Sequence, residues 1–166
     1  MADQKIEYAS SAAMTVSPAS LASDTNLLAG VESTAVDNTS NKYLDYLLAG
    51  KLTTGSSPTD VRQIQIYVYG QLEDTPVYPD VIDGSSSGET ITSDDIRDAA
   101  LRLAAVMPTN NTSDRTYYFG PLSVAALFGG SVPKRWGVFV VHNTGVNLNS
   151  TGGNQAIWYT PIYATV

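Results

Sequence analysis

Apolar and polar positions alternate along several short stretches of the chain, most clearly in RQIQIYVYG at residues 62–70. Ile64, Ile66 and Val68 share one face of the strand that this pattern predicts, and glutamines and tyrosines share the other. A weaker alternation over residues 43–48 predicts another strand. Strands with this periodicity pack one face on a core, so the pattern indicates a β protein.

Three further stretches extend this reading toward the C-terminus. WGVFVVHN, residues 136–143, is apolar on both faces in its middle, as in a strand covered on both sides, and QAIWYTPIY closes the chain after a Gly/Asn/Ser loop. LRLAAVMPT either continues a preceding helical turn or forms a strand, and we expect a strand that starts near Ala100. NNTSD followed by RTYYFG is typical of a hairpin return, which predicts that the strands LRLAAVMPT and RTYYFG pair with each other.

Residues 71–98 differ from the rest of the chain. They hold eight of the sixteen acidic residues, one arginine, two prolines and the run SSSG. We expect a long surface loop followed by a helical turn. Ser93 is suited to the N-cap, and Asp94 and Asp95 would lie in the first turn, where the helix dipole favours them. SVAALFGG predicts a second short helical turn.

These elements predict an all-β fold, an antiparallel jelly-roll-like β-sandwich of about eight strands with less than about 15% helix. No predicted helix is long enough for a βαβ crossover. Residues 21–166 would form the sandwich and residues 1–20 an extended N-terminal arm, whose first dozen residues we expect to be mobile until they order on a neighbour. The predicted core comprises Ile64, Ile66, Val68, Leu101, Leu103, Val138, Val140 and Trp158.

Composition narrows the function. The net charge is -7, and Lys134-Arg135 is the one basic cluster, whereas nucleic-acid binding needs a cationic stripe, so we expect no nucleic-acid partner. Charged residues are only 15% of the chain and tyrosines number ten, which favours a surface built for contacts. The chain has no cysteine, no secretory signal pattern and no apolar run of membrane-spanning length. We therefore expect an unexported chain without a membrane partner.

Few residues are candidates for catalysis. GSSSG matches the G-x-S-x-G pattern around Ser86, but no strand precedes it and no helix follows it directly, so a surface loop is the better interpretation. His142, the only histidine, lies where a strand runs into the turn Asn143-Thr144-Gly145. We expect it to hydrogen-bond turn backbone through one ring nitrogen.

Acidic residues give no clear site either. Asp80, Asp83 and Glu89 lack the spacing of an EF-hand, although a looser loop-bound cation stays open. Glu73-Asp74 and Asp94-Asp95 are adjacent carboxylates, and neighbours on a strand or loop point apart rather than facing each other across a sugar. We predict no enzyme activity, no cofactor and no metal.

Several tyrosines are candidates for contacts with a partner. Tyr67 and Tyr69 lie on the strand face opposite the isoleucines, where exposed aromatics can stack on sugars or dock a protein, or can cover a second packed layer. Both readings stay open from the sequence. We name Tyr8, Tyr67, Tyr69 and Tyr78 as predicted partner contacts.

Several sequence segments together resemble small virion proteins of tailed bacteriophages, of the capsid decoration or cement kind. They are VDNTSNKYLDYLLAGKLTTG, YVYGQLEDTPVYPDV, NTSDRTYYFGP, FGGSVPKRWGVFVVHNTG and YTPIYATV, and the likeness covers nearly the whole chain from about Tyr8. The resemblance implies a jelly-roll-like sandwich on the outside of an icosahedral head, often as trimers, made in the host cytoplasm. It implies the major capsid protein as partner, with neighbouring capsid subunits tied together.

Two other functions stay open. One is a carbohydrate-binding β-sandwich of a head fibre, which binding to glycans through Tyr67 or Tyr69 would favour. The other is a tail or neck component of the virion with the same fold. The number of copies per particle distinguishes a tail component from a capsid decoration protein, since a shell protein is present in hundreds of copies and a tail protein in a few.

Overall fold

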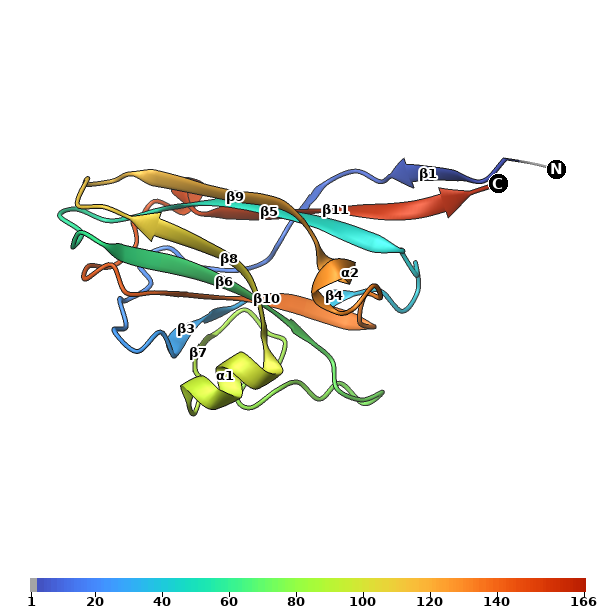
Figure 1. The fold of residues 1–166 in the computed structure, drawn as a ribbon, viewed down its shortest axis with the longest axis horizontal. Helices are drawn as coiled ribbons and strands as arrows, with labels where there is room; N and C mark the ends of the chain where they lie inside the picture. Colours follow the sequence, from blue (N-terminus) through green and yellow to red (C-terminus); the bar gives the residue numbers. More distant parts are fainter. Residues whose placement is uncertain (1–2) are drawn as a thin grey trace.

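The computed structural model describes residues 3–166 and shows two antiparallel sheets packed face to face (Figure 1). The first sheet has the order β1 (Lys5–Tyr8), β11 (Ala156–Thr165), β5 (Asp45–Thr53) and β9 (Thr116–Ser123), and β2 (Ala12–Ala13) also pairs with β11. The second has the order β7 (Gly88–Thr90), β3 (Ala29–Glu32), β10 (Arg135–His142), β6 (Arg62–Gly70) and β8 (Arg102–Thr109), and β4 (Val36–Asp37) pairs with β10.

This arrangement confirms the predicted all-β antiparallel sandwich, with 9% of the chain in helix. The helices are α1 (Asp94–Ala100), α2 (Val124–Leu127) and the 3-10 turn η1 (Gly152–Asn154). Eleven strands are present in the described residues instead of about eight, because β2, β4 and β7 are too short to show an alternation. The jelly-roll connectivity stays a prediction.

The predicted hairpin between residues 101–109 and 115–120 is wrong. β8 bonds to β6 in the second sheet, whereas β9 bonds to β5 in the first, so the NNTSD turn carries the chain from one sheet to the other. A cluster of turn residues shows that the chain reverses, but it does not show whether the two strands bond to each other. The same crossing recurs between β9 and β10 and between β10 and β11.

Most of the predicted core is confirmed. Five of the predicted residues are fully buried between the sheets, and Leu101 is buried in a second cluster; the five are Ile64, Ile66, Val68, Val138 and Val140. Leu103 and Trp158 are wrong, because they are 47% and 39% exposed. A bulge in β8 places Leu103 opposite Tyr67 on the outer face, and Trp158 lies between two inward-facing neighbours on β11.

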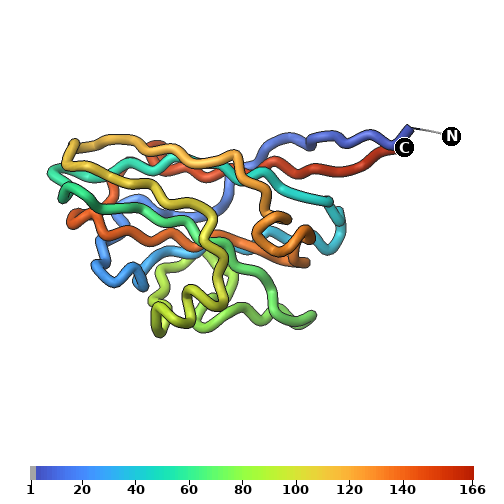
Figure 2. The backbone as a smooth tube through the Cα atoms, viewed as in Figure 1, coloured from blue at the N-terminus to red at the C-terminus, as the bar shows by residue number. Residues whose placement is uncertain are grey.

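Residues 71–101, which we call the covering segment, lie over the outer face of the second sheet (Figures 1 and 2). They include β7 and α1, and the predicted cap is confirmed, since the Ser93 hydroxyl accepts a hydrogen bond from the Ile96 amide. Below the segment lies a second apolar cluster formed by Leu27, Tyr67, Tyr69, Tyr78, Ile82, Ile91, Leu101, Phe139 and Val141. The molecule therefore has a core between its sheets and another beneath the covering segment.

The N-terminal segment pairs with the C-terminal strand instead of standing alone. β1 lies antiparallel to the last residues of β11, and the two project from the sandwich as a ribbon (Figures 1 and 2). The predicted arm over residues 1–20 is too long, because Met14 is buried in the core and β2 pairs with β11. The projecting part ends near Ala9; residues 1–2 lie outside the described part, and the mobility of the arm stays a prediction.

Candidate binding face

The strand register of the first sheet decides which side chains face outward. On β11, Ile157 and Tyr159 pack into the core, so Trp158, Thr160 and Ile162 point to the other side of the sheet. The same rule applies to β5, where Tyr46 and Leu48 are buried and the residues between them face out. Because no bulge interrupts the β5–β11 pairing, these outward positions form continuous cross-strand rows.

The outward rows make one extended apolar surface. Tyr118 of β9 lies opposite Lys51, Trp158 lies between Ala49 and Ala13, and the apolar side of the ribbon continues the surface past Ile162. We call this surface the bare face; it comprises Ile6, Tyr8, Ala13, Leu47, Ala49, Tyr118, Trp158, Ile162 and Ala164, with Lys51 as the one charged residue between Tyr118 and β11. Tyr118 is 74% exposed and Tyr8 is 64% exposed, so large aromatic groups are accessible on it.

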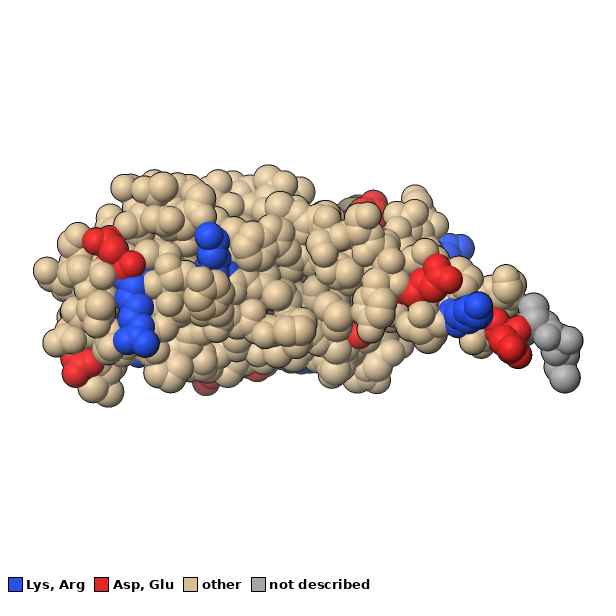
Figure 3. All heavy atoms as spheres, turned by 90° about the horizontal axis from the view of Figure 1, so that it is seen from above, with Lys and Arg blue, Asp and Glu red and all other residues tan. Residues whose placement is uncertain are grey.

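The bare face carries little charge. Seen from the side of the first sheet, the surface is mostly uncharged, and the charged side chains lie mainly toward its two ends (Figure 3). Asp45 is engaged locally, since its carboxylate accepts hydrogen bonds from the Ser123 hydroxyl at 2.6 Å and the Ala125 amide at 2.8 Å. An apolar surface of this kind is a candidate interaction site.

The opposite outer face is closed by specific bonds. The buried carboxylate of Glu32 accepts from the backbone amides of Asp83 at 3.1 Å and Gly84 at 3.0 Å, which holds the covering segment onto β3. Burial raises the pKa of Glu32 above its usual value, although these two amides act in the other direction. The Tyr69 hydroxyl donates to the Ser33 carbonyl at 2.6 Å beneath the segment.

Three of the four tyrosines predicted to contact a partner are buried, so the prediction is wrong for these three. Tyr67, Tyr69 and Tyr78 are only 3%, 0% and 7% exposed, because the covering segment packs on them. The second of the two sequence readings, a packed second layer, is the correct one for Tyr67 and Tyr69. Tyr8 is exposed on the ribbon, and its contact with a partner stays a prediction.

Sequence reasoning missed Trp158 and Tyr118, the two large aromatics of the bare face. Trp158 lies in a stretch that is apolar at successive positions, so its outward direction could not be read from alternation. The useful signal was present in another form: a strand that is apolar on both faces needs cover on both faces. In β10 the covering segment provides it, and in β11 nothing within residues 3–166 does.

The serine and the histidine of the catalytic hypothesis do not meet. The His142 ring is fully buried, with Nε2 3.0 Å from the Leu21 carbonyl and Nδ1 3.0 Å from the Thr144 hydroxyl. The Ser86 hydroxyl is buried without a hydrogen-bond partner. Both ring nitrogens are thus bonded instead of the expected one, and the expected bond to turn backbone is wrong, because the backbone partner is Leu21 and the turn contributes the Thr144 hydroxyl. Burial lowers the pKa of His142.

The acidic candidates are also used separately. Asp80 accepts from the Thr92 amide and hydroxyl, Asp83 accepts from the Ser85 amide, and Glu89 accepts from the Ser87 hydroxyl. Over residues 3–166 no group of three or more histidine or acidic side chains is placed to hold a metal ion. The loose cation site that the sequence left open therefore has no assembled ligand set in this part of the chain.

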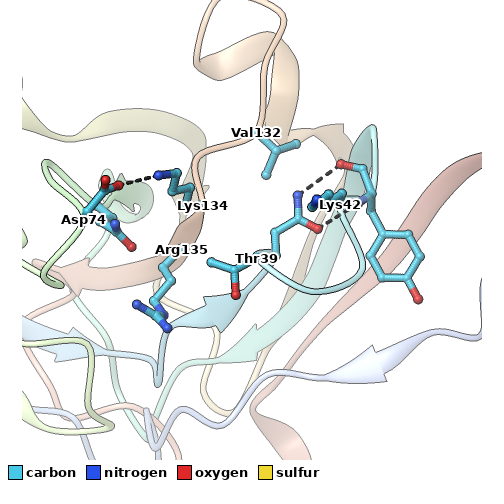
Figure 4. A pocket seen from close by; sticks show the side chains of 9 residues that line it. Thr39, Lys42, Asp74, Val132, Lys134 and Arg135 are labelled. Carbon is cyan, nitrogen blue, oxygen red and sulfur yellow. Dashed lines mark hydrogen bonds and ion pairs between the residues drawn. The ribbon is translucent and has the colours of Figure 1, made fainter.

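A pocket of about 630 Å³ lies at the end of the sandwich near the base of the ribbon (Figure 4). Lys42, Lys134 and Arg135 line it, but Lys134 pairs with Asp74 and Arg135 pairs with Asp37 at 2.7 Å. The Thr39 hydroxyl and amide, together with Arg135, lower the pKa of Asp37 to about 2. Two of the three cations are thus neutralised by carboxylates, so the pocket is not a preformed anion site.

No family model, curated protein or solved structure matches this chain. Among the helices of residues 3–166, none is long and apolar enough to cross a membrane. Since the catalytic candidates lie apart and the cations of the pocket are paired, the bare face is the strongest functional feature of residues 3–166.

Proposed function

We propose that this chain is a virion structural protein that decorates the outside of an icosahedral phage head and stabilises the head by bridging neighbouring major capsid subunits. The observation that carries the proposal is the bare face, which is extended, aromatic and nearly free of charge (Figure 3). The resemblance of the chain to capsid decoration proteins supplies the identity of the partner.

The physical properties of the chain support this role. Neutral polar and aromatic surfaces are typical of protein contacts, and a net charge of -7 suits the exterior of a shell whose interior holds DNA. Each bound copy would add interface free energy that exists only in the assembled shell. Binding would thereby stabilise the shell against heat and internal pressure by mass action.

The bare face provides the largest contact for this purpose. Trp158 lies between Ala13 and Ala49, and exposed tryptophan and tyrosine side chains are the residues that most often dominate the energy of an interface. Tyr118 stands two strands away on β9, opposite Lys51, the outward position next to Ala49. The two aromatics lie close together on one face, which suits the centre of a flat protein contact.

A second candidate function uses the same residues. Trp158 and Tyr118 stand on an accessible β-face, and aromatic rings there can stack on sugar rings. A head-fibre lectin would bind glycans through these two side chains. Binding to a glycan array that is lost in Trp158→Ala would favour this function over the decoration role.

The decisive experiment compares shells assembled with and without the chain. We expect particles that carry it to resist heat and osmotic shock better, and unchanged resistance would reject the decoration role. Tyr118→Asp places a charge on the bare face and should weaken shell binding at least tenfold, because the charge would be desolvated without a partner. Leu72→Asp is the matched control, since Leu72 is 65% exposed on the covering segment, away from the bare face. We expect this variant to bind shells normally.

A further inference from the structure

The ribbon is the least supported part of the sheet. β11 pairs with β5 only as far as Ile162, so its last residues have β1 as their single partner. All four residues of β1 are exposed, and an isolated two-stranded ribbon is only marginally stable in water. The free edge of β1 is therefore a surface that an added strand would stabilise.

The hydrogen-bond pattern shows which backbone groups point along that edge. The Ala9 amide donates to the Pro161 carbonyl at 2.9 Å, and this bond sets the register, so Glu7 and Lys5 also direct their backbone groups to β11. Ile6 and Tyr8 alternate with them. Their N–H and C=O groups consequently point away from β11 and are available to another strand.

The side chains along the edge are complementary to themselves. Lys5 and Glu7 share one side of the ribbon with Tyr163 and Thr165, whereas Ile6 and Tyr8 share the apolar side with Ile162 and Ala164. Lys5 and Glu7 flank Ile6 at equal spacing. Reversing the direction of the strand about Ile6 therefore exchanges the positions of the positive and the negative charge. An antiparallel copy of the same strand would therefore meet opposite charges at both positions.

We propose that β1 pairs with β1 of a second copy of this chain, antiparallel and centred on Ile6. Lys5 lies opposite the partner's Glu7, Glu7 lies opposite the partner's Lys5, and Ile6 exchanges both backbone hydrogen bonds with the partner's Ile6. The two ribbons become one four-stranded sheet. The inference concerns this chain alone and does not depend on the proposed capsid role.

Charge complementarity distinguishes this occupant from an arbitrary strand. Any extended peptide could use the backbone groups of Ile6, but opposite-charge cross-strand pairs on both sides of the centre select a copy of β1. A two-fold axis perpendicular to the ribbon also keeps both apolar sides on the same side of the new sheet. The bare faces of two copies then form one continuous surface, twice as long as either.

Cysteine cross-linking tests the register, and the chain has no cysteine of its own. In the proposed pair the two Ile6 Cα atoms lie about 5.5 Å apart, within the range of a disulfide. Tyr8 is the matched control, because it is as exposed as Ile6 but lies on the order of 13 Å from its counterpart in the partner. Under a copper–phenanthroline oxidant, I6C should form a disulfide-linked dimer at least tenfold faster than Y8C. Equal rates, or no dimer from I6C, would overturn the proposal.

Charge reversal provides a second test by sedimentation of mixed chains. K5E and E7K each place like charges opposite each other, so each variant alone should dimerise at least fivefold more weakly than the natural chain. An equimolar mixture should form K5E–E7K heterodimers, because opposite charges then meet at both positions. A mixture that associates no better than its components would reject the pairing even if both variants fold normally.

Discussion

Tyr69 and Phe139 stand on the outer face of the second sheet, much as Trp158 and Tyr118 stand on the outer face of the first. The first pair is buried beneath residues 71–101, and the second pair is open to solvent. Similar residue types on similar strands thus end in different environments, because the chain covers one face itself. The comparison teaches that an aromatic strand face becomes a binding candidate only when no segment of the same chain packs on it.

The largest contrast should appear in stability. Tyr69→Ala removes a fully buried ring together with its hydrogen bond to the Ser33 carbonyl, and should cost about 3–5 kcal/mol of unfolding free energy. Trp158→Ala removes a partly exposed ring and should cost roughly 1 kcal/mol or less, as surface changes usually do. Urea unfolding of both variants measures the difference. Equal losses would mean that the bare face is as integral to the fold as the covered one.

The next effect concerns the attachment of the covering segment. Glu32→Ala leaves the amides of Asp83 and Gly84 without their acceptor and should cost about 2–3 kcal/mol. Hydrogen exchange should accelerate over residues 83–91 well before it accelerates in β5 or β11. Uniform acceleration throughout the chain would show that the segment and the sandwich unfold as one unit.

A smaller effect should appear as a dependence of stability on pH. The pKa of His142 is lowered in the folded protein, so the unfolded chain binds more protons below pH 6.5 and stability falls as the pH drops through that value. His142→Asn should cost at most about 1.5 kcal/mol at neutral pH and abolish this loss. The raised pKa of Glu32 acts in the opposite direction, because folding then favours the protonated acid and stability falls as the pH rises above 4.5.

Thermal unfolding between pH 4.5 and 7.5 checks the sign of both effects. The natural chain should lose stability on acidification below pH 6.5, and His142→Asn should lose less. The lowered pKa values of Asp24, Asp37 and Asp83 add a loss toward pH 4.5 that both chains share. Shell binding by His142→Asn at pH 7 should be unchanged, since the buried ring belongs to neither outer face. A steeper acid loss in the variant would show that another group controls the response.

The smallest effect on stability is expected for removal of the projecting part of the N-terminus. Deletion of residues 1–8 removes a strand with no buried residue and should lower the melting temperature by only about 2–4 °C, as a loss near 1 kcal/mol does in a domain of this size. The same deletion should clearly weaken shell binding. A large fall in melting temperature would instead make β1 an integral strand of the sandwich.

The sequence predicted the parts of the fold in which alternation is strict. The isoleucines of β6 alternate with polar residues, so their direction and burial could be read directly. Alternation fails for Trp158, because successive apolar residues on β11 leave two possible directions, and for Leu103, because a bulge shifts the register by one residue. Neither feature has a periodic signal in the sequence.

The site was harder to predict than the fold. The burial of Tyr67 and Tyr69 depends on contacts with residues far along the chain, in a segment whose composition indicated only a loop. Sheet membership has the same difficulty, since the choice between a hairpin and a crossing at residues 110–115 is made by the free edges of β5 and β6. Long-range packing therefore decided which aromatics are accessible.

The tip of the covering segment offers a use that follows from its position. Glu73 and Val77 close a small exposed turn by a backbone bridge, and this turn lies on the side of the molecule away from the bare face (Figure 1). A peptide inserted between Asp74 and Pro76 would lengthen an exposed turn without entering either apolar cluster, and such insertions cost little. If the bare face rests on a particle, the inserted peptide would be displayed outward, which makes this turn the natural place to attach an antigen or a fluorescent label.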